Sequence, residues 1–200
     1  MHRICILLIM CVLCILSCTQ KKSYRNFENI DFQEGDIVFR KGNSTKSQAV
    51  LYTDTAGVYS HAGIIALINN TFMVIHIAPG ERKKNEKEDK IKAEPINDFW
   101  SKKKAQHGAI YRLKDNSLGK KAAQQAIRLL KKEILFDHDY KLDDTTKMYC
   151  TEFVWYIYSI EGQDITFGKR SQLNAPLFTG TYIFPSDIYR HEEFDLIFNF

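Results

Sequence analysis

The cysteines of this chain are the residues whose types and positions point most directly to covalent chemistry. Cys5, Cys11, Cys14 and Cys18 lie near the N-terminus, whereas Cys150 stands alone 132 positions after Cys18. If an export segment carries the first four, Cys150 is the only free thiol of the mature protein. A lone thiol cannot form an internal disulfide, so Cys150 is either a small buried apolar residue or a nucleophile.

A nucleophilic cysteine reacts as its thiolate, which is a minor species near neutral pH. Cys150 stands at the start of a helix predicted over residues 149–160, where unpaired backbone N–H groups favour negative charge. The same N–H groups can hold a developing oxyanion. Asp143 and Asp144 oppose the thiolate if they lie close and do not serve as caps. We therefore expect the pKa of the Cys150 thiol to lie below its ordinary value.

Histidine is the expected base, and a predicted hairpin selects two candidates. Strands expected over 61–68 and 71–77 flank a turn of two asparagines, which tolerate positive φ. Symmetric pairing about this turn puts His61 and His76 on one face as diagonal neighbours within side-chain reach. A slip of one residue would put them on opposite faces. The remaining histidines lie in polar stretches and are expected at the surface: His107, His138 and His191.

This placement suggests a relay in which Cys150 is the nucleophile and His61 is the general base. His76 would accept a hydrogen bond from His61 and fix its tautomer. Two other uses of these residues stay open at this point. A core cysteine and structural histidines would give the same pattern, and Cys-His-His could ligate zinc. No close pair such as Cys-x-x-Cys supports a metal, so neither a metal nor another cofactor is expected.

Hydrophobic periodicity predicts an α+β fold in which helices pack against an antiparallel sheet. Residues 78–94 are predicted to form a solvated loop because charges of both signs crowd it. The expected strands are 36–40, 61–68, 71–77 and 109–113. The expected helices are 44–52, 96–103, 117–132, 149–160 and a short one opened by Pro185.

The N-terminus has the pattern of an export segment. An uninterrupted apolar run of 13 residues, Ile4 to Leu16, is too short to span a bilayer comfortably and is typical of a secretory signal. It ends in a sequence that resembles a bacterial lipobox, with Cys18 as the residue to be lipidated. An uncleaved anchor or a signal without lipid remains the alternative.

These features predict a signal peptide over 1–17, a lipidated Cys18 with a tether to residue 30, and one domain over 31–200. We expect a lipid-anchored protein of the bacterial cell envelope, with the outer membrane favoured because Thr19 is not an aspartate. The net charge of +4 is mild, and basic residues alternate with acidic ones. Nucleic acid is therefore not an expected partner.

Three segments occur in an order that resembles the circularly permuted NlpC/P60 family, the YaeF/YiiX-like branch of the papain-fold cysteine amidases. They are Gly35–Phe39, Tyr59–Ile64 and Tyr149–Trp155. The resemblance covers about residues 35–190. It implies a permuted papain-like fold whose nucleophile helix packs on the sheet.

Carried over residue by residue, the resemblance gives Cys150 as nucleophile and His61 as base. His76 falls where several relatives have glutamate. Tyr149 and Tyr182 are expected to line the substrate cleft.

The resemblance implies a cysteine hydrolase that cleaves amides in cell-wall peptides, such as peptidoglycan fragments, or in related small molecules. One alternative is a lipid acyl enzyme of the lecithin:retinol acyltransferase-like type. The second histidine, His76, suits this type. However, the Asn-Cys-Glu-His-Phe sequence that surrounds its nucleophile is replaced here by Tyr149–Phe153. Another is a non-catalytic envelope binding module. A hydrophobic slot beside Cys150 would favour lipid, and a polar cleft with carboxylate-binding groups would favour peptide.

Overall fold

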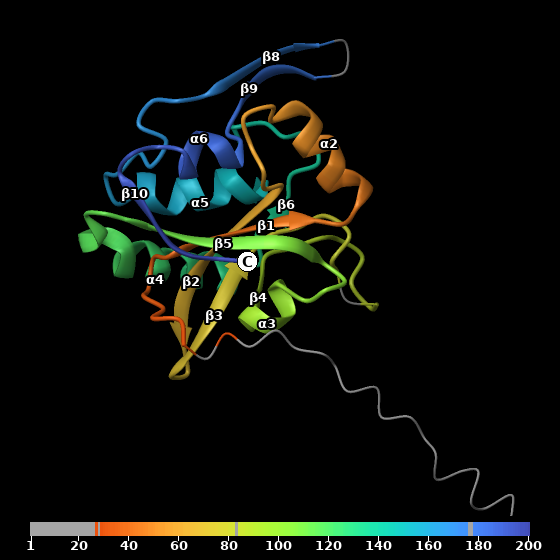
Figure 1. The fold of residues 1–200 in the computed structure, drawn as a ribbon. Coiled ribbons are helices and arrows are strands. Elements are labelled where there is room, and N and C mark those ends of the chain that lie inside the picture. The colour runs from red at the N-terminus through yellow and green to blue at the C-terminus, as the bar shows by residue number, and fades with distance from the viewer. Residues whose placement is uncertain (1–26, 28, 83, 176–177) are drawn as a thin grey trace, which may run out of the picture.

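A computed structural model describes residues 27, 29–82, 84–175 and 178–200 (Figure 1). The predicted signal peptide over 1–17 and the predicted lipidation residue Cys18 lie outside the described residues. No helix in the described part is long and apolar enough to cross a membrane. Phe27, which the sequence placed in the tether, is 7% exposed and packs edge-on against Trp100. The packed domain therefore already includes Phe27.

The fold is built on a six-stranded sheet in the order β10-β5-β1-β2-β3-β4. Every neighbouring pair in this sheet is antiparallel. Its strands are β1 (Ile37–Gly42), β2 (His61–Ile68), β3 (Thr71–His76), β4 (Lys92–Glu94), β5 (Ala105–Leu113) and β10 (Phe194–Asn199).

Helices cover both faces of this sheet, and two small ribbons complete the fold. Figure 1 shows α5 and α6 on one side of the sheet and α3 on the other. The helices are α2 (Thr45–Thr53), α3 (Ile96–Phe99), α4 (Gly119–Lys131), α5 (Cys150–Ser159) and α6 (Pro185–Tyr189), with a 3-10 turn at Asn116–Leu118. The ribbons are the parallel pair β6 (Leu135–Phe136) and β7 (Lys147–Met148), and the antiparallel hairpin β8 (Ser171–Ala175) and β9 (Phe178–Tyr182). This architecture confirms the predicted α+β class.

Alternation along the strands sends neighbouring residues into two separate cores. In β1, Phe39 joins the core beneath α4 and α5, whereas Val38 joins the core beneath α3. The second core gathers the aromatic residues Phe27, Phe99 and Trp100. Because both faces are covered, β2 is buried from His61 to Ala66, which explains its unbroken apolar sequence.

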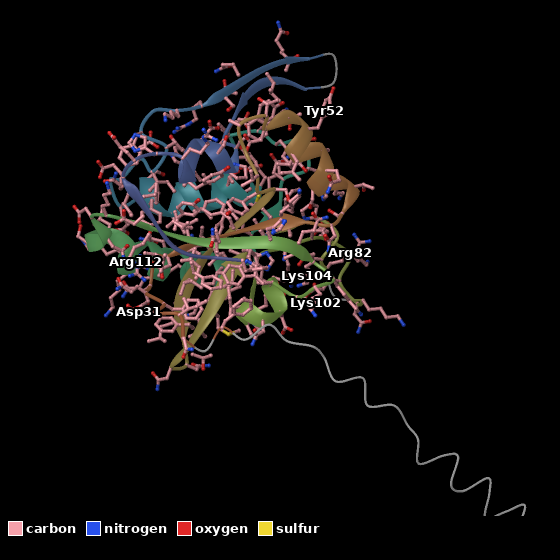
Figure 2. All side chains as sticks on the ribbon, viewed as in Figure 1. Asp31, Tyr52, Arg82, Lys102, Lys104 and Arg112 are labelled. Carbon is pink, nitrogen blue, oxygen red and sulfur yellow. The ribbon has the colours of Figure 1, made fainter. Side chains whose placement is uncertain are left out.

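The Gly-Asp pair that precedes β1 pins this central strand to its surroundings. Gly35 has φ +94°, and a Cβ there would lie 2.3 Å from Gly119 Cα, so only glycine fits. The Tyr158 hydroxyl donates to the Gly35 carbonyl at 2.6 Å. Asp36 is fully buried and accepts from Arg112 Nε at 2.7 Å. Figure 2 shows Arg112 beside Asp31, whose carbonyl accepts from the same guanidinium.

Three predicted elements differ from the structure. β4 lies within the stretch predicted to be a loop, because its backbone pairs with β3 in the register Ile75↔Ala93. β5 begins at Ala105, four residues earlier than expected, because pairing with β1 extends to that residue. The helix after Pro95 ends at Phe99 rather than near residue 103.

Candidate active site

Cys150 and His61 line the same open pocket, whose empty space is about 440 Å³ with its solvent-open part included. Each stands at the first residue of its element, Cys150 in α5 and His61 in β2. The sheet thus positions the histidine, and a helix packed on that sheet positions the thiol. The full lining is Arg40, Ser44, Lys46, Ser47, Val50, Ser60, His61, Ala78, Pro79, Glu81, Phe136, Tyr140 and Cys150.

The two histidines of the predicted relay meet as the hairpin register requires. β2 and β3 pair symmetrically about the asparagine turn, with Ile64 opposite Ile75. His61 Nε2 lies 2.9 Å from His76 Nδ1, and the two rings are close to perpendicular. His61 is 4% exposed and His76 is fully buried. The expected same-face placement is therefore confirmed.

A carboxylate continues the chain of contacts beyond His76. His76 Nε2 lies 3.1 Å from Glu94 Oε1. Glu94 is the last residue of β4, and sequence reasoning missed it. Three residues are too few to show a strand period, and the neighbouring charges suggested solvent rather than a buried contact.

Glu94 belongs to a partly buried ionic cluster at one end of the sheet. Lys104 Nζ lies 2.8 Å from both Glu94 oxygens, and Lys92 Nζ lies 3.2 Å from one of them. Lys92 and Lys104 also contact Glu81, at 2.8 and 3.2 Å. Figure 2 shows Lys104 beside α3. The prediction of a solvated loop is therefore wrong for Glu81 and Lys92, because their side chains are drawn into this cluster.

Arg40 connects the cluster to the pocket. It lies opposite His61 in the β1–β2 register and is 4% exposed. Its guanidinium pairs with Glu81, donates to the Phe99 carbonyl at 3.0 Å and stacks 4.6 Å above the Phe99 ring. A fixed positive charge therefore stands beside the two histidines.

Burial and this charge keep both histidines neutral. Burial, followed by the charge of Arg40, holds the pKa of His61 well below its ordinary value. Burial also lowers the pKa of His76 to about 4, although its bond to Glu94 opposes the shift. Burial raises the pKa of Glu94, but the His76 bond and the lysine charges outweigh it and bring that pKa down to about 2. Near neutral pH, the contacts from His61 through His76 to Glu94 therefore join two uncharged imidazoles to one ionised carboxylate.

The thiol differs from the sequence expectation. Burial raises the pKa of Cys150, and the backbone N–H groups of Ala62 and Thr151 together with the charge of Arg40 only partly offset it. Desolvation of the Cys150 thiol outweighs the stabilisation that the start of the helix gives its thiolate. Among the described residues, no hydrogen bond joins Cys150 to His61. The resting site thus pairs a neutral thiol with a neutral imidazole.

The two tyrosines expected along the cleft lie elsewhere. Tyr149 is 4% exposed, and its hydroxyl accepts the Ile183 N–H at 2.9 Å, so this side chain belongs to the core. Tyr182 lies in β9, where its ring stacks on Phe184. Neither lines the pocket. Tyr140, which has φ +55°, and Phe136 are the aromatic residues of the lining instead.

The remaining histidines stand apart from the pocket. His107 and His138 are exposed, as expected for surface residues. His191 is half-buried, and its ring stacks on Phe167 with the centroids 3.8 Å apart.

Comparison with known proteins supports the fold and the family. Residues 31–197 match the family described as the permuted papain-like amidases, YaeF/YiiX, C92 family. A solved structure described as the metalloprotein yiiX from Escherichia coli O157:H7 has a TM-score of 0.65 and 21% identity, covering 82% of this chain and 96% of that one. At that identity the likeness shows the shared fold. No curated protein matches.

The family match covers most of the chain and is narrower than the NlpC/P60 name that the three motifs suggested. It agrees with the order of the elements, in which the Gly-Asp strand and the histidine strand precede the cysteine helix. This chain therefore belongs to the permuted papain-like amidases of the YaeF/YiiX C92 family and is a cysteine hydrolase of amide bonds.

Proposed function

We propose that this protein cleaves peptide-like amides of the cell envelope, with Cys150 as nucleophile and His61 as general base and acid. The observation that carries the proposal is that both residues line one pocket while His76 fixes the His61 ring from behind at 2.9 Å. His76 has no place in the pocket lining, so its role is to orient His61.

The reaction follows from these positions. His61 takes the thiol proton as the sulfur attacks the substrate carbonyl, and the oxyanion forms near the backbone N–H groups that begin α5. His61 then gives that proton to the leaving amine, and a thioester remains on Cys150. Water, deprotonated by His61, attacks the thioester and releases the acid, and the proton returns to the thiolate. A neutral resting pair suits this sequence because His61 starts with a free lone pair.

The polarity of the pocket supports a peptide-like substrate over a lipid chain. Seven of its thirteen lining residues carry a hydroxyl or a charge, and the apolar part of its wall includes Val50, Ala78, Pro79 and Phe136. Lys46 is exposed at the first turn of α2 and has no ion-pair partner among the described residues. It is available for a substrate carboxylate, which peptides of the cell wall carry.

A metal is not part of this proposal, although the similar solved structure is described as a metalloprotein. His76, Glu81 and Glu94 offer ligand atoms within 4.8 Å of one another. However, the ammonium groups of Lys92 and Lys104 already lie 2.8–3.2 Å from these carboxylates. A divalent cation would have to displace both lysines against their repulsion.

The proposed location is the bacterial cell envelope, with a lipid on Cys18 holding the protein at a membrane. It rests on the apolar run that ends in the lipobox-like sequence before Cys18. Such an anchor would place the pocket close to envelope substrates.

The function is tested by incubating the full chain in detergent with peptidoglycan fragments and, separately, with phospholipid vesicles. Mass spectrometry should show amide cleavage of the fragments by the wild type and none by Cys150→Ala. His61→Ala should lower the rate by roughly 10²–10⁴-fold. The matched control His107→Ala should keep full activity because His107 is exposed and outside the pocket. Fatty-acid release from the vesicles with intact fragments would identify a lipid acyl enzyme instead.

A further inference from the structure

We infer that Glu94 is a positioning residue of this site, which fixes the tautomers of both histidines so that His61 Nδ1 is the atom that takes the proton. The inference rests on the proposed roles of Cys150 and His61 and adds a fourth member that acts only through His76.

The argument is a sequence of donors and acceptors that begins at the carboxylate. Ionised Glu94 can only accept, so His76 Nε2, at 3.1 Å, must carry a hydrogen. A neutral imidazole has one N–H, so His76 Nδ1 is an acceptor. His61 Nε2, at 2.9 Å from that atom, must then be the donor. The remaining nitrogen of His61, Nδ1, is left with a free lone pair.

The sheet holds Glu94 in place for this task. His76 lies opposite Lys92 in the β3–β4 register, which makes Glu94 its diagonal neighbour on the same face. Lys104 binds both carboxylate oxygens at 2.8 Å, and Lys92 adds a contact at 3.2 Å. These ammonium groups keep the carboxylate ionised and restrict its rotation, so the acceptor stays aimed at His76.

The surrounding charges keep both imidazoles neutral. Three cations, Arg40, Lys92 and Lys104, face two carboxylates, Glu81 and Glu94, which leaves one net positive charge. A protonated histidine would add a second positive charge to a partly buried site. Glu94 thus determines which ring nitrogen of each histidine carries the hydrogen. The net positive charge of the cluster prevents either imidazole from binding a second proton.

The test is ¹⁵N NMR of histidine-labelled full-length protein, because ring nitrogen shifts distinguish the two neutral tautomers. The His61 and His76 signals are assigned with His61→Gln and His76→Gln variants. The wild type should show both rings protonated at Nε2. Glu94→Gln should mix the tautomers and slow acylation of Cys150 by an activated ester roughly 10–100-fold. The matched control Glu133→Gln also removes a lysine-paired carboxylate, but at the surface, and should change neither readout.

A wild-type spectrum with the proton of His76 on Nδ1 would overturn the inference, whether or not Glu94→Gln folds. Unchanged tautomers together with unchanged acylation in folded Glu94→Gln would also overturn it. The NMR readout uses the resting protein and needs no substrate. Tautomers that depend on Glu94 in a protein that cleaves no amide would therefore support the inference while refuting the proposed function.

Discussion

Replacing Gly63 by alanine should move the two histidines apart without substituting either of them. Gly63 lies in β2 beside His76 of β3. A Cβ at this position would lie 3.0 Å from His76 Cβ, 3.0 Å from the Ile75 carbonyl oxygen and 2.8 Å from Val74 Cγ1. The carbonyl belongs to the sheet backbone, and Val74 is fully buried with a stiff β-branched side chain. The substitution therefore pushes His76 away from β2, the strand that carries His61.

The size of the effect follows from these distances. Ordinary contact requires His76 to move by about 0.4 Å, which lengthens the 2.9 Å separation from His61 Nε2 beyond the usual hydrogen-bond range of about 2.7–3.2 Å. Overpacking of this kind costs about 1–3 kcal/mol of stability. Loss of the orienting bond should lower the acylation rate of the folded protein by about 10-fold or more.

The assay combines urea unfolding with single-turnover acylation of Cys150 by an activated ester. Gly119→Ala is the matched control, because its Cβ would meet Asn116 Oδ1 at 2.0 Å and the Glu34 carbonyl oxygen at 2.7 Å, and neither residue lines the pocket. It should lose stability yet acylate normally in its folded fraction. A folded Gly63→Ala protein that acylates at the wild-type rate would refute the orienting role of His76.

Three further predictions concern the thiol, a buried carboxyl and the anchor. The rate of Cys150 alkylation by iodoacetamide should rise with pH, and its midpoint should lie above the ordinary thiol pKa because burial raises the pKa of Cys150. Even an unshifted thiol is only about 3% ionised at pH 7. A rate that does not change between about pH 5 and 9 would show a preformed thiolate and contradict the prediction. Burial, and then the charge of neighbouring aspartates such as Asp137, raises the pKa of Glu152 from 4.5 to about 8. The protonated Glu152 therefore contributes stability that is fully present below about pH 4.5 and is lost as the pH rises to about 8. Glu152→Gln should therefore gain unfolding free energy relative to the wild type across this window, and parallel pH profiles in urea would contradict it. The Cys18→Ala variant should be released from the membrane fraction or keep its signal peptide. Continued fatty-acid labelling of this variant would exclude lipidation at Cys18.

The histidine pair could be predicted from the sequence because both determinants are local. A strand has a period of two, and the asparagine turn sets the register, so the positions of His61 and His76 fix their face. Glu94 could not be predicted in the same way. Its strand has three residues and exists because β3 offers it backbone partners, and its carboxylate is buried because two lysines and His76 converge on it.

The cysteine shows the same division between local and tertiary determinants. The start of α5 at Cys150 follows from the sequence, and the structure places it there. The direction of its pKa shift does not, because burial of the sulfur depends on the packing of α5 against the sheet. Tyr149 was misplaced for a similar reason. The residue before the helix turns its ring into the core, where the Ile183 N–H binds its hydroxyl.

The central claim is that Cys150 carries the acyl group during amide hydrolysis. Mass spectrometry of the intact full-length chain, quenched with acid during turnover of an activated amide, tests it directly. We predict a mass increase of one acyl group that peptide mapping places on Cys150 and that Cys150→Ala abolishes along with hydrolysis. An acyl group on another residue, or continued hydrolysis by Cys150→Ala, would contradict the account.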